Sequence, residues 1–134
     1  MQSKVLAIAT VLCFSACTAT AEPTSADVHY RSFDATSIVR LTEEIMITSA
    51  GSELHISDPS RLARIRKLID APCQSSDQPQ SEMDLRVLIY FNGESGRSTW
   101  KASRLDFYDS STDRMCRMSE SLKDALSQEL GNGS

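Results

Sequence analysis

Apolar and polar residues alternate along several short stretches of the chain, and this pattern predicts strands that bury one face. Residues 38–48 are rich in β-branched and apolar side chains, with Ile45 and Ile47 close to polar neighbours. Residues 53–57 alternate in the same way and place two aliphatic side chains on one face and His55 on the other. The small, turn-forming residues between the two stretches predict that both are strands joined by a tight connection.

A second, more apolar stretch at residues 84–91 carries apolar side chains on both faces of an extended chain. That pattern is typical of a central strand, because both of its faces are covered. Residues 92–96 contain two glycines and an asparagine and predict a hairpin turn, after which residues 97–108 return as the partner strand. The apolar positions of this return strand change face, which predicts a bulge near residues 103–104.

Two other stretches repeat apolar residues every three or four positions, the spacing of an amphipathic helix. The first has Asp58 as its N-cap and Pro59 at its first position, and it stops before Pro72. The second begins at Ser119 and ends at Gly131, which suits a C-terminal cap. The inward positions are Leu62, Ile65, Leu68 and Ile69 in the first helix and Leu122, Ala125, Leu126 and Leu130 in the second. The chain is therefore predicted to form an α+β domain, an antiparallel β-sheet with two α-helices.

The N-terminus has the pattern of a secretory signal peptide. Lys4 precedes an uncharged, mostly apolar run at residues 5–14, far shorter than the roughly 20 residues that cross a bilayer. Small residues follow the run, as cleavage requires. No later stretch approaches transmembrane length, so we expect the mature chain to be soluble or held to a membrane only by a lipid.

Two cleavage sites compete in this region. Residues 14–17 (Phe-Ser-Ala-Cys) resemble the lipobox of bacterial lipoproteins, which usually begins with Leu. The resemblance implies cleavage after residue 16 and a lipid on Cys17. Residues 19–21 (Ala-Thr-Ala) form an ordinary signal-peptidase site, and cleavage after residue 21 would release a soluble periplasmic or secreted protein. The lipoprotein interpretation divides the chain into a signal peptide (1–16), a flexible N-terminal tether (17–34) and a single folded domain (35–131).

Either cleavage leaves one pair of cysteines, Cys73 and Cys116, in the mature chain. Two cysteines in an oxidising compartment usually form a disulfide, and a single pair has only one connectivity. Closing a loop of about 43 residues is expected to stabilise the fold by about 4 kcal/mol in the chain-entropy model. Neither cysteine belongs to a Cys-x-x-Cys motif or lies next to a histidine in sequence, which favours a structural role over a reactive one.

The charge balance excludes some classes of partner. Loss of Lys4 leaves 13 of the 14 basic residues against 18 acidic ones, a net charge of about −5 with His neutral. We expect such a chain to bind no nucleic acid and to reach a membrane only through a lipid anchor. His29 and His55 lack a further ligand at metal-binding spacing, and no nucleophile motif or phosphate-binding loop is recognisable. We therefore expect no catalytic residue, no metal and no cofactor.

Two groups of residues are candidates for contact with a partner protein. The first is a basic stripe at helical spacing along the first predicted helix, made of Arg61, Arg64 and Lys67. Arginine recognises carboxylates with a fork of donors, but a solvated outer helix face would show the same pattern. The second group is the predicted hairpin tip, which a rigid sheet would present to a cleft, made of Asn92, Gly93 and Glu94.

Export, small size, one disulfide and a lipobox are together typical of proteins on the periplasmic side of the bacterial envelope. We interpret the chain as a non-enzymatic, protein-binding lipoprotein of the outer membrane, such as an inhibitor or an immunity-like protein, with an envelope protein as its partner. Two other classes stay open: a structural or assembly accessory lipoprotein, and a small envelope hydrolase.

Overall fold

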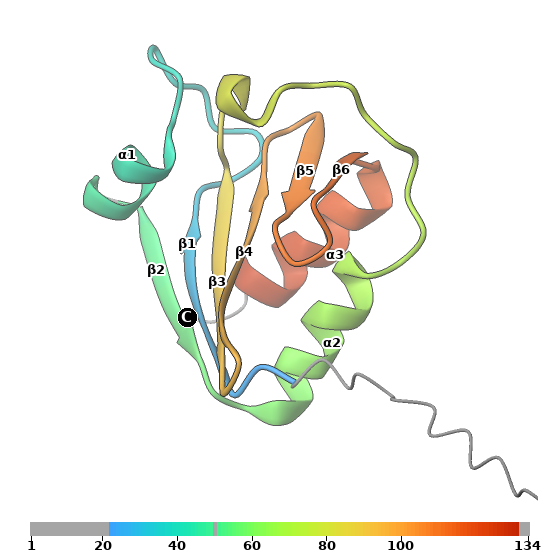
Figure 1. Cartoon of the computed structure of the whole chain (residues 1–134). Helices are drawn as coiled ribbons and strands as arrows, with labels where there is room; N and C mark the ends of the chain where they lie inside the picture. Colours follow the sequence, from blue (N-terminus) through green and yellow to red (C-terminus); the bar gives the residue numbers. More distant parts are fainter. Residues whose placement is uncertain (1–21, 50, 132–134) are drawn as a thin grey trace, which may run out of the picture.

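The computed structural model describes residues 22–49 and 51–131, which form a six-stranded antiparallel sheet and three α-helices (Figure 1). The strand order is β2-β1-β3-β4-β5-β6. In chain order the elements are β1 (Ser25–Tyr30), α1 (Glu43–Thr48), β2 (Ser52–Ile56), α2 (Pro59–Ile69), the 3-10 turn η1 (Gln80–Glu82), β3 (Val87–Gly93), β4 (Gly96–Ala102), β5 (Asp106–Asp109), β6 (Arg114–Arg117) and α3 (Glu120–Gly131). The predicted α+β class with an antiparallel sheet is confirmed. No helix in this part of the chain is long and apolar enough to cross a membrane.

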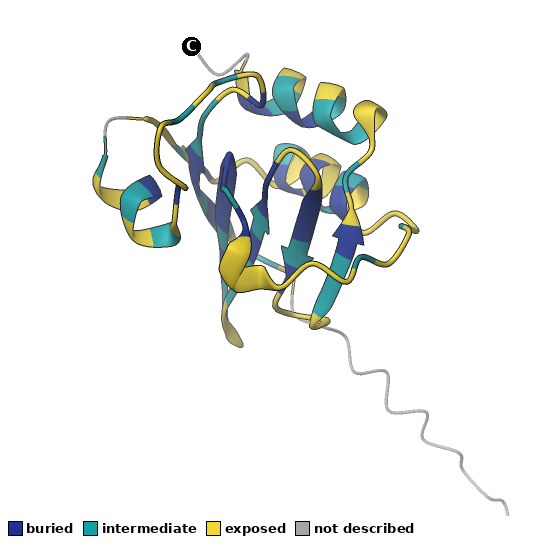
Figure 2. Ribbon diagram, turned by 90° about the horizontal axis from the view of Figure 1, so that it is seen from above, coloured by how far each residue is buried: buried dark blue, intermediate teal, exposed yellow. Residues whose placement is uncertain are grey.

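Helices α2 and α3 cover one face of the sheet and enclose the larger core (Figures 1 and 2). Alternate side chains of each strand point to this face, because successive residues of a strand face opposite sides. Val28, Ile89 and Trp100 are completely buried there, against Ile65 from α2 and Leu126 from α3. Each apolar side chain of this size stabilises the fold by about 2 kcal/mol when it leaves water.

The opposite face of the sheet is covered mainly at one end, where α1 lies (Figure 1). A second, smaller core forms there from Leu41, Met46, Met83, Leu85 and Leu88. The rest of this face, called the open face below, carries polar side chains because the alternate positions of β1, β3 and β4 are polar. They include Asp27, His29, Tyr90, Asn92, Arg97, Thr99 and Lys101.

The two predicted helices begin and end close to the expected residues. Asp58 accepts a hydrogen bond from the backbone N–H of Ser60 at 3.1 Å, and Pro59 occupies the first position of α2. The hydroxyl of Ser119 accepts from the N–H of Leu122 at 3.1 Å and caps α3. These local signals act within a few residues of the helix ends, which is why they could be identified in the sequence.

The predicted tether (17–34) is wrong in its second half. Residues 25–30 form β1, which pairs with β2 on one side and β3 on the other and so lies inside the sheet. Ala26 and Val28 are completely buried, because they belong to the larger core. The folded domain therefore begins before residue 25 and not at residue 35. The predicted signal peptide (1–16) and the tether residues before Glu22, Cys17 among them, lie outside the described residues.

The predicted strand at residues 38–48 is wrong, because a helix cap overrides the β-propensity of these residues. α1 begins after Thr42, whose hydroxyl accepts a hydrogen bond from the N–H of Ile45 at 3.3 Å. Glu43 and Glu44 fall in the first turn, where carboxylates interact favourably with free backbone N–H groups. The described chain consequently has three α-helices and not two.

The predicted return strand at residues 97–108 is two antiparallel strands, β4 and β5, joined by a turn. The hydroxyl of Ser103 holds the turn by accepting from the N–H groups of Leu105 (3.2 Å) and Asp106 (3.1 Å). The apolar positions change face here because the chain reverses direction. The predicted bulge is therefore wrong.

The predicted disulfide between Cys73 and Cys116 is confirmed, with Cα atoms 5.8 Å apart. It joins the segment that follows α2 to β6, the last strand of the sheet. Backbone hydrogen bonds of 2.7 and 3.0 Å then link residues 74–76 to Arg117 and Met115. This segment thereby supplies partners to the outer edge of β6.

A buried arginine fastens the loop between β1 and α1. Only 2% of the Arg86 side chain is exposed. Its guanidinium donates to the backbone carbonyls of Ala35 (3.1 Å) and Leu85 (2.9 Å) and to the carboxylate of Asp84 (3.1 Å). These acceptors compensate for removing the charge from water, which would otherwise be strongly unfavourable.

Candidate functional site

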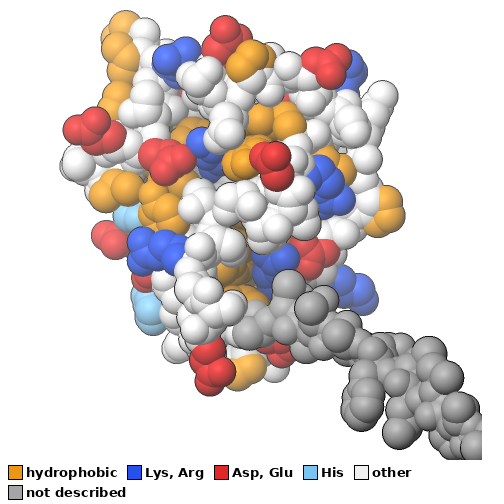
Figure 3. All heavy atoms as spheres, viewed as in Figure 1, with side chains coloured by type: hydrophobic (Ala, Val, Ile, Leu, Met, Phe, Trp, Pro, Cys, Tyr) orange, Lys and Arg blue, Asp and Glu red, His pale blue; other side chains and the backbone are white. Residues whose placement is uncertain are grey.

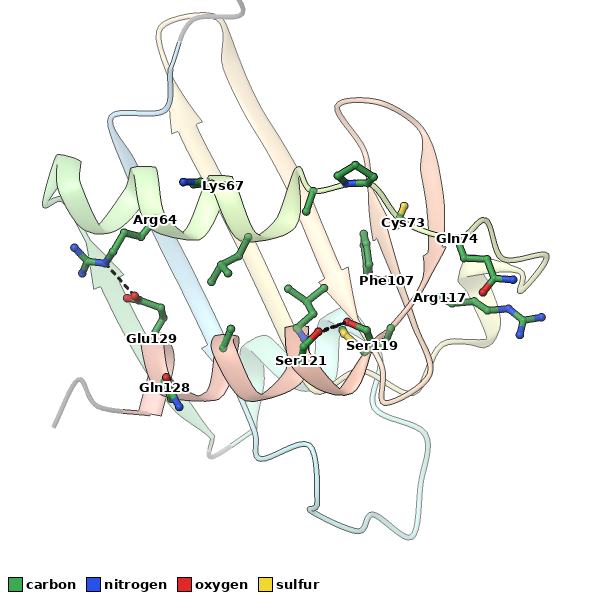
Figure 4. A pocket seen from close by; sticks show the side chains of 16 residues that line it. Arg64, Lys67, Cys73, Gln74, Phe107, Arg117, Ser119, Ser121, Gln128 and Glu129 are labelled. Carbon is green, nitrogen blue, oxygen red and sulfur yellow. Dashed lines mark hydrogen bonds and ion pairs between the residues drawn. The ribbon is translucent and has the colours of Figure 1, made fainter.

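An open groove of about 800 Å³ lies between α2 and α3 and extends to the disulfide (Figure 4). Its apolar lining includes Leu68 from α2, Leu122 from α3 and Phe107 from β5. Phe107 is almost completely buried and belongs to the larger core, so the sheet supports this part of the groove. Ligand sites in proteins commonly have volumes of about 300–1,000 Å³. The groove is thus large enough to receive several side chains of a partner.

Two arginines of the predicted basic stripe fasten α2 to the last turn of α3. Arg61 donates to the backbone carbonyl of Glu129, and Nε of Arg64 donates to the Glu129 carboxylate at 2.9 Å (Figure 4). A cation is favourable at this position because the carbonyl end of a helix carries partial negative charge. Glu129 also raises the pKa of the Arg64 guanidinium. Arg61 and Arg64 are therefore partly structural.

The remaining cations of the groove are Lys67 and Arg117, whose side chains have no ion pair or hydrogen bond among the described residues. Counted over the described lining, three cationic side chains stand against one carboxylate, that of Glu129, which Arg64 already engages. The groove is locally positive on a chain whose overall charge is −4. Such a surface favours a partner segment that carries carboxylates.

The predicted hairpin tip does not join this site, and its first residue is tied to the sheet. The amide of Asn92 donates to Asp27 at 3.0 Å and its carbonyl accepts from Arg97 at 2.9 Å. A Cβ on Gly93 would lie 3.5 Å from the carbonyl oxygen of Glu22. The exposed part of the tip begins at Glu94. Asn92 therefore links three strands of the sheet, and Gly93 leaves room for the chain at Glu22, so both residues have a structural role.

The sequence-based reasoning missed Arg117 and the apolar lining of the groove. Arg117 comes next to the groove because it follows Cys116, and the disulfide brings this end of β6 to the C-terminal end of α2. The predicted disulfide was the signal that could have placed it there. Phe107 could not be placed, because the interpretation of residues 97–108 as one strand assigned it to the wrong part of the sheet.

A second polar cluster lies on the open face, centred on Asp27 of β1. Oδ1 of Asp27 is 2.7 Å from Nδ1 of His55 on β2, and its Oδ2 is 3.6 Å from Arg97 on β4. Hydrogen bonds from His55 and Asn92 lower the pKa of the Asp27 carboxyl. An ionised carboxylate only accepts hydrogen bonds, so Nδ1 of His55 is the donor. A histidine oriented by an aspartate is one part of a general-base arrangement, but no hydroxyl or thiol of the described chain is bonded to His55.

Among residues 22–49 and 51–131, no group of three or more His, Cys, Asp or Glu side chains could hold a metal ion. The chain matches no protein-family model, no curated protein and no solved structure. Within the described residues, the groove between α2 and α3 combines an apolar lining with two cations that have no ion pair there.

Proposed function

We propose that the protein is a non-enzymatic, protein-binding lipoprotein of the bacterial envelope, of the inhibitor or immunity-like kind. In this proposal the groove between α2 and α3 receives a segment of a partner protein that combines apolar side chains with carboxylates. The observation that carries the proposal is the apolar groove lined by Lys67 and Arg117, neither of which has an ion pair or hydrogen bond in the part of the chain that the structure describes.

The energetics of the groove support this choice of partner. An apolar floor contributes affinity by removing aliphatic or aromatic side chains of the partner from water. The cations contribute specificity and orient the bound segment, because they attract its carboxylates and repel a basic segment. A few such anchors commonly carry most of the binding energy of an interface. The support of α2 and α3 by the sheet and by the Arg61 and Arg64 contacts limits the freedom that binding must remove.

Charge reversal at the groove tests the proposal. Lys67→Glu combined with Arg117→Glu is expected to weaken binding of the partner at least about tenfold, because two attractive contacts become repulsive. A photoreactive amino acid at Ser121, which lines the groove, would capture the partner in cells of the native host. The measurement is the yield of this crosslink together with the affinity of the purified pair.

The control is Arg40→Glu, a reversal of charge at an exposed residue outside the groove. This control is expected to keep the affinity of the native protein, with both variants melting as the native protein does. Equal capture by the groove variant and by the control would show that the groove is not the binding site. Turnover of a peptidoglycan or ester substrate by the purified native protein would contradict the non-catalytic proposal itself.

The lipid anchor is the second part of the proposal, and it rests on the lipobox-like residues 14–17. Expression of the full chain in a Gram-negative host should place the protein in the outer-membrane fraction. Cys17→Ser should make it soluble or leave its precursor uncleaved, because the lipid acceptor is gone. Native protein found wholly in the soluble fraction, with Glu22 as its first residue, would show that the ordinary signal-peptidase site is used instead.

The position of Glu22 gives the anchor a geometric consequence. Glu22 lies beside Gly93, so the chain enters the fold at the hairpin between β3 and β4. The five residue-to-residue steps from Cys17 to Glu22 can span at most about 18 Å. A lipid on Cys17 would therefore hold this hairpin near the membrane, and this placement favours the groove over the hairpin tip as the site for a partner.

A further inference from the structure

The two edges of the sheet differ in what covers them. Residues 74–76 form backbone hydrogen bonds with β6 at one edge, next to the disulfide. At the other edge lies β2 (Ser52–Ile56), and no backbone hydrogen bond from the described residues reaches its outer side. β2 is the last strand on this side of the sheet; in Figure 1, α1 lies to the left of its upper end, and no helix or strand is drawn to the left of the rest of β2.

An open edge of this kind is a template for another strand, because its N–H and C=O groups lack partners. Proteins usually protect such an edge with a very short strand, charged side chains (lysine above all), proline, a bulge or a covering segment. β2 has five residues, and Glu53 is its one acidic side chain. β2 has the sequence Ser-Glu-Leu-His-Ile and contains neither proline nor lysine. All five of its residues pair with β1 in unbroken register, so no bulge twists the edge away. The edge is therefore competent to pair.

We propose that β2 pairs antiparallel with β2 of a second copy of this chain, around a twofold axis at Leu54, and joins the two sheets into one. In a twofold interface the same residues appear on both sides, so the edge must be complementary to itself. Glu53 and His55 fulfil this condition. They are two residues apart, on the same face of β2, and opposite in charge when the histidine is protonated.

The faces of the sheet limit the register of this pair. Leu54 and Ile56 pack on the larger core, whereas Glu53 and His55 belong to the open face. Residues directly opposite in an antiparallel pair lie on the same face, so a shift by one residue would place Glu53 opposite core positions. A shift by two residues in either direction places Glu53 opposite Glu53, or His55 opposite His55. Only the pair centred on Leu54 sets each Glu53 opposite a His55 and overlaps the full strand.

The hydrogen bond between His55 and Asp27 determines when this pairing is strongest. Nδ1 of His55 donates to Asp27, so only a protonated histidine can also donate from Nε2 to Glu53 of the second copy. The charged and titratable groups around His55 are Asp27 and His29 on β1, Tyr90 on β3, Arg97 on β4 and Glu53 on its own strand, with His29 directly opposite Glu53. Association should therefore strengthen as the pH falls through the range in which histidine gains a proton.

Sedimentation measures this association. The chain expressed with Cys17→Ser is used throughout, after mass spectrometry has shown that the apolar run 5–14 has been removed, so that neither a lipid nor the signal peptide contributes to self-association. We expect its average mass to rise towards that of a dimer as concentration increases, and at lower concentration at about pH 5.5 than at about pH 8. Glu53→Lys should weaken the dimer about tenfold or more, because two opposite-charge pairs become like-charge pairs.

Two further variants locate the interface. Glu94→Lys makes the same charge change at the exposed hairpin tip and should leave the dimer unchanged. His55→Glu added to Glu53→Lys restores opposite charges across the axis but sets a carboxylate beside Asp27, so it should recover part of the affinity. A wild-type chain that stays monomeric over a hundredfold range of concentration would overturn the proposal. So would a Glu94→Lys variant that weakens association as much as Glu53→Lys does, provided that all variants melt as folded proteins.

Discussion

Replacing Cys73 and Cys116 by alanine is expected to lower the free energy of unfolding by about 4 kcal/mol. The disulfide closes a loop of 43 residues, and the unfolded chain gains the corresponding freedom when the bond is absent. For a domain of this size, the melting temperature should fall by about 15–30 °C. The fluorescence of Trp100 can follow the transition, since it is the chain's only tryptophan and is completely buried.

The disulfide also keeps residues 74–76 along β6 and lies at one end of the groove. Its loss should therefore destabilise this region of the fold more than the rest. Hydrogen exchange in β6 should accelerate more than in β3, which lies in the middle of the sheet. Reduction of the native protein serves as the control, because it opens the bond without changing a residue. A loss of less than about 1 kcal/mol would show that the chain-entropy description does not apply to this loop.

The parts of the fold that could be predicted from the sequence are those with strong local signals. Asp58 and Pro59 mark the start of α2 whatever lies around them, and the apolar stretch before Asn92 predicts β3. The disulfide followed from the compartment and from counting cysteines. Each of these inferences needs only neighbouring residues or an inventory of the chain.

The parts that could not be predicted depend on contacts between distant residues. β1 is a short and partly polar strand, and only its position between β2 and β3 makes Ala26 and Val28 core residues. α1 differs from β1, because a local signal for it is present in the sequence. Thr42 is a good N-cap residue, but the β-branched residues around it predict a strand. The burial of Arg86 could not be predicted from its neighbours in sequence, because one of its hydrogen-bond acceptors is the carbonyl of Ala35, far away in the chain.

The candidate site likewise has a part that the sequence predicted and a part that depends on contacts between distant residues. The basic stripe could be found because helical spacing places Arg61, Arg64 and Lys67 along α2. Its role could not, because Glu129 of α3, which engages both arginines, is more than sixty residues away. The sequence therefore predicted which cations lie on α2, and the packing of α3 leaves Lys67 as the member of the basic stripe without an ion pair or hydrogen bond among the described residues.

Trp100→Ala is expected to destabilise the fold by about 3–5 kcal/mol, which is comparable to the loss of the disulfide. The side chain is completely buried, and its ring lies 5.3 Å from that of Phe107, centre to centre. Alanine would remove this contact and leave a cavity that the surrounding strands and helices can only partly fill. Urea unfolding followed by circular dichroism measures the effect, since this variant has no tryptophan to report on it.

Trp100→Phe is the matched control, and it separates packing from hydrogen bonding. Nε1 of Trp100 is buried without a hydrogen-bond partner among the described residues, and an unpaired donor of this kind is unfavourable by about 1–3 kcal/mol. Phenylalanine loses part of the ring but also removes that donor, so the two effects oppose each other. We expect a net loss below about 1.5 kcal/mol. A loss as large as that of the alanine variant would instead mean that the indole N–H makes a stabilising contact in solution.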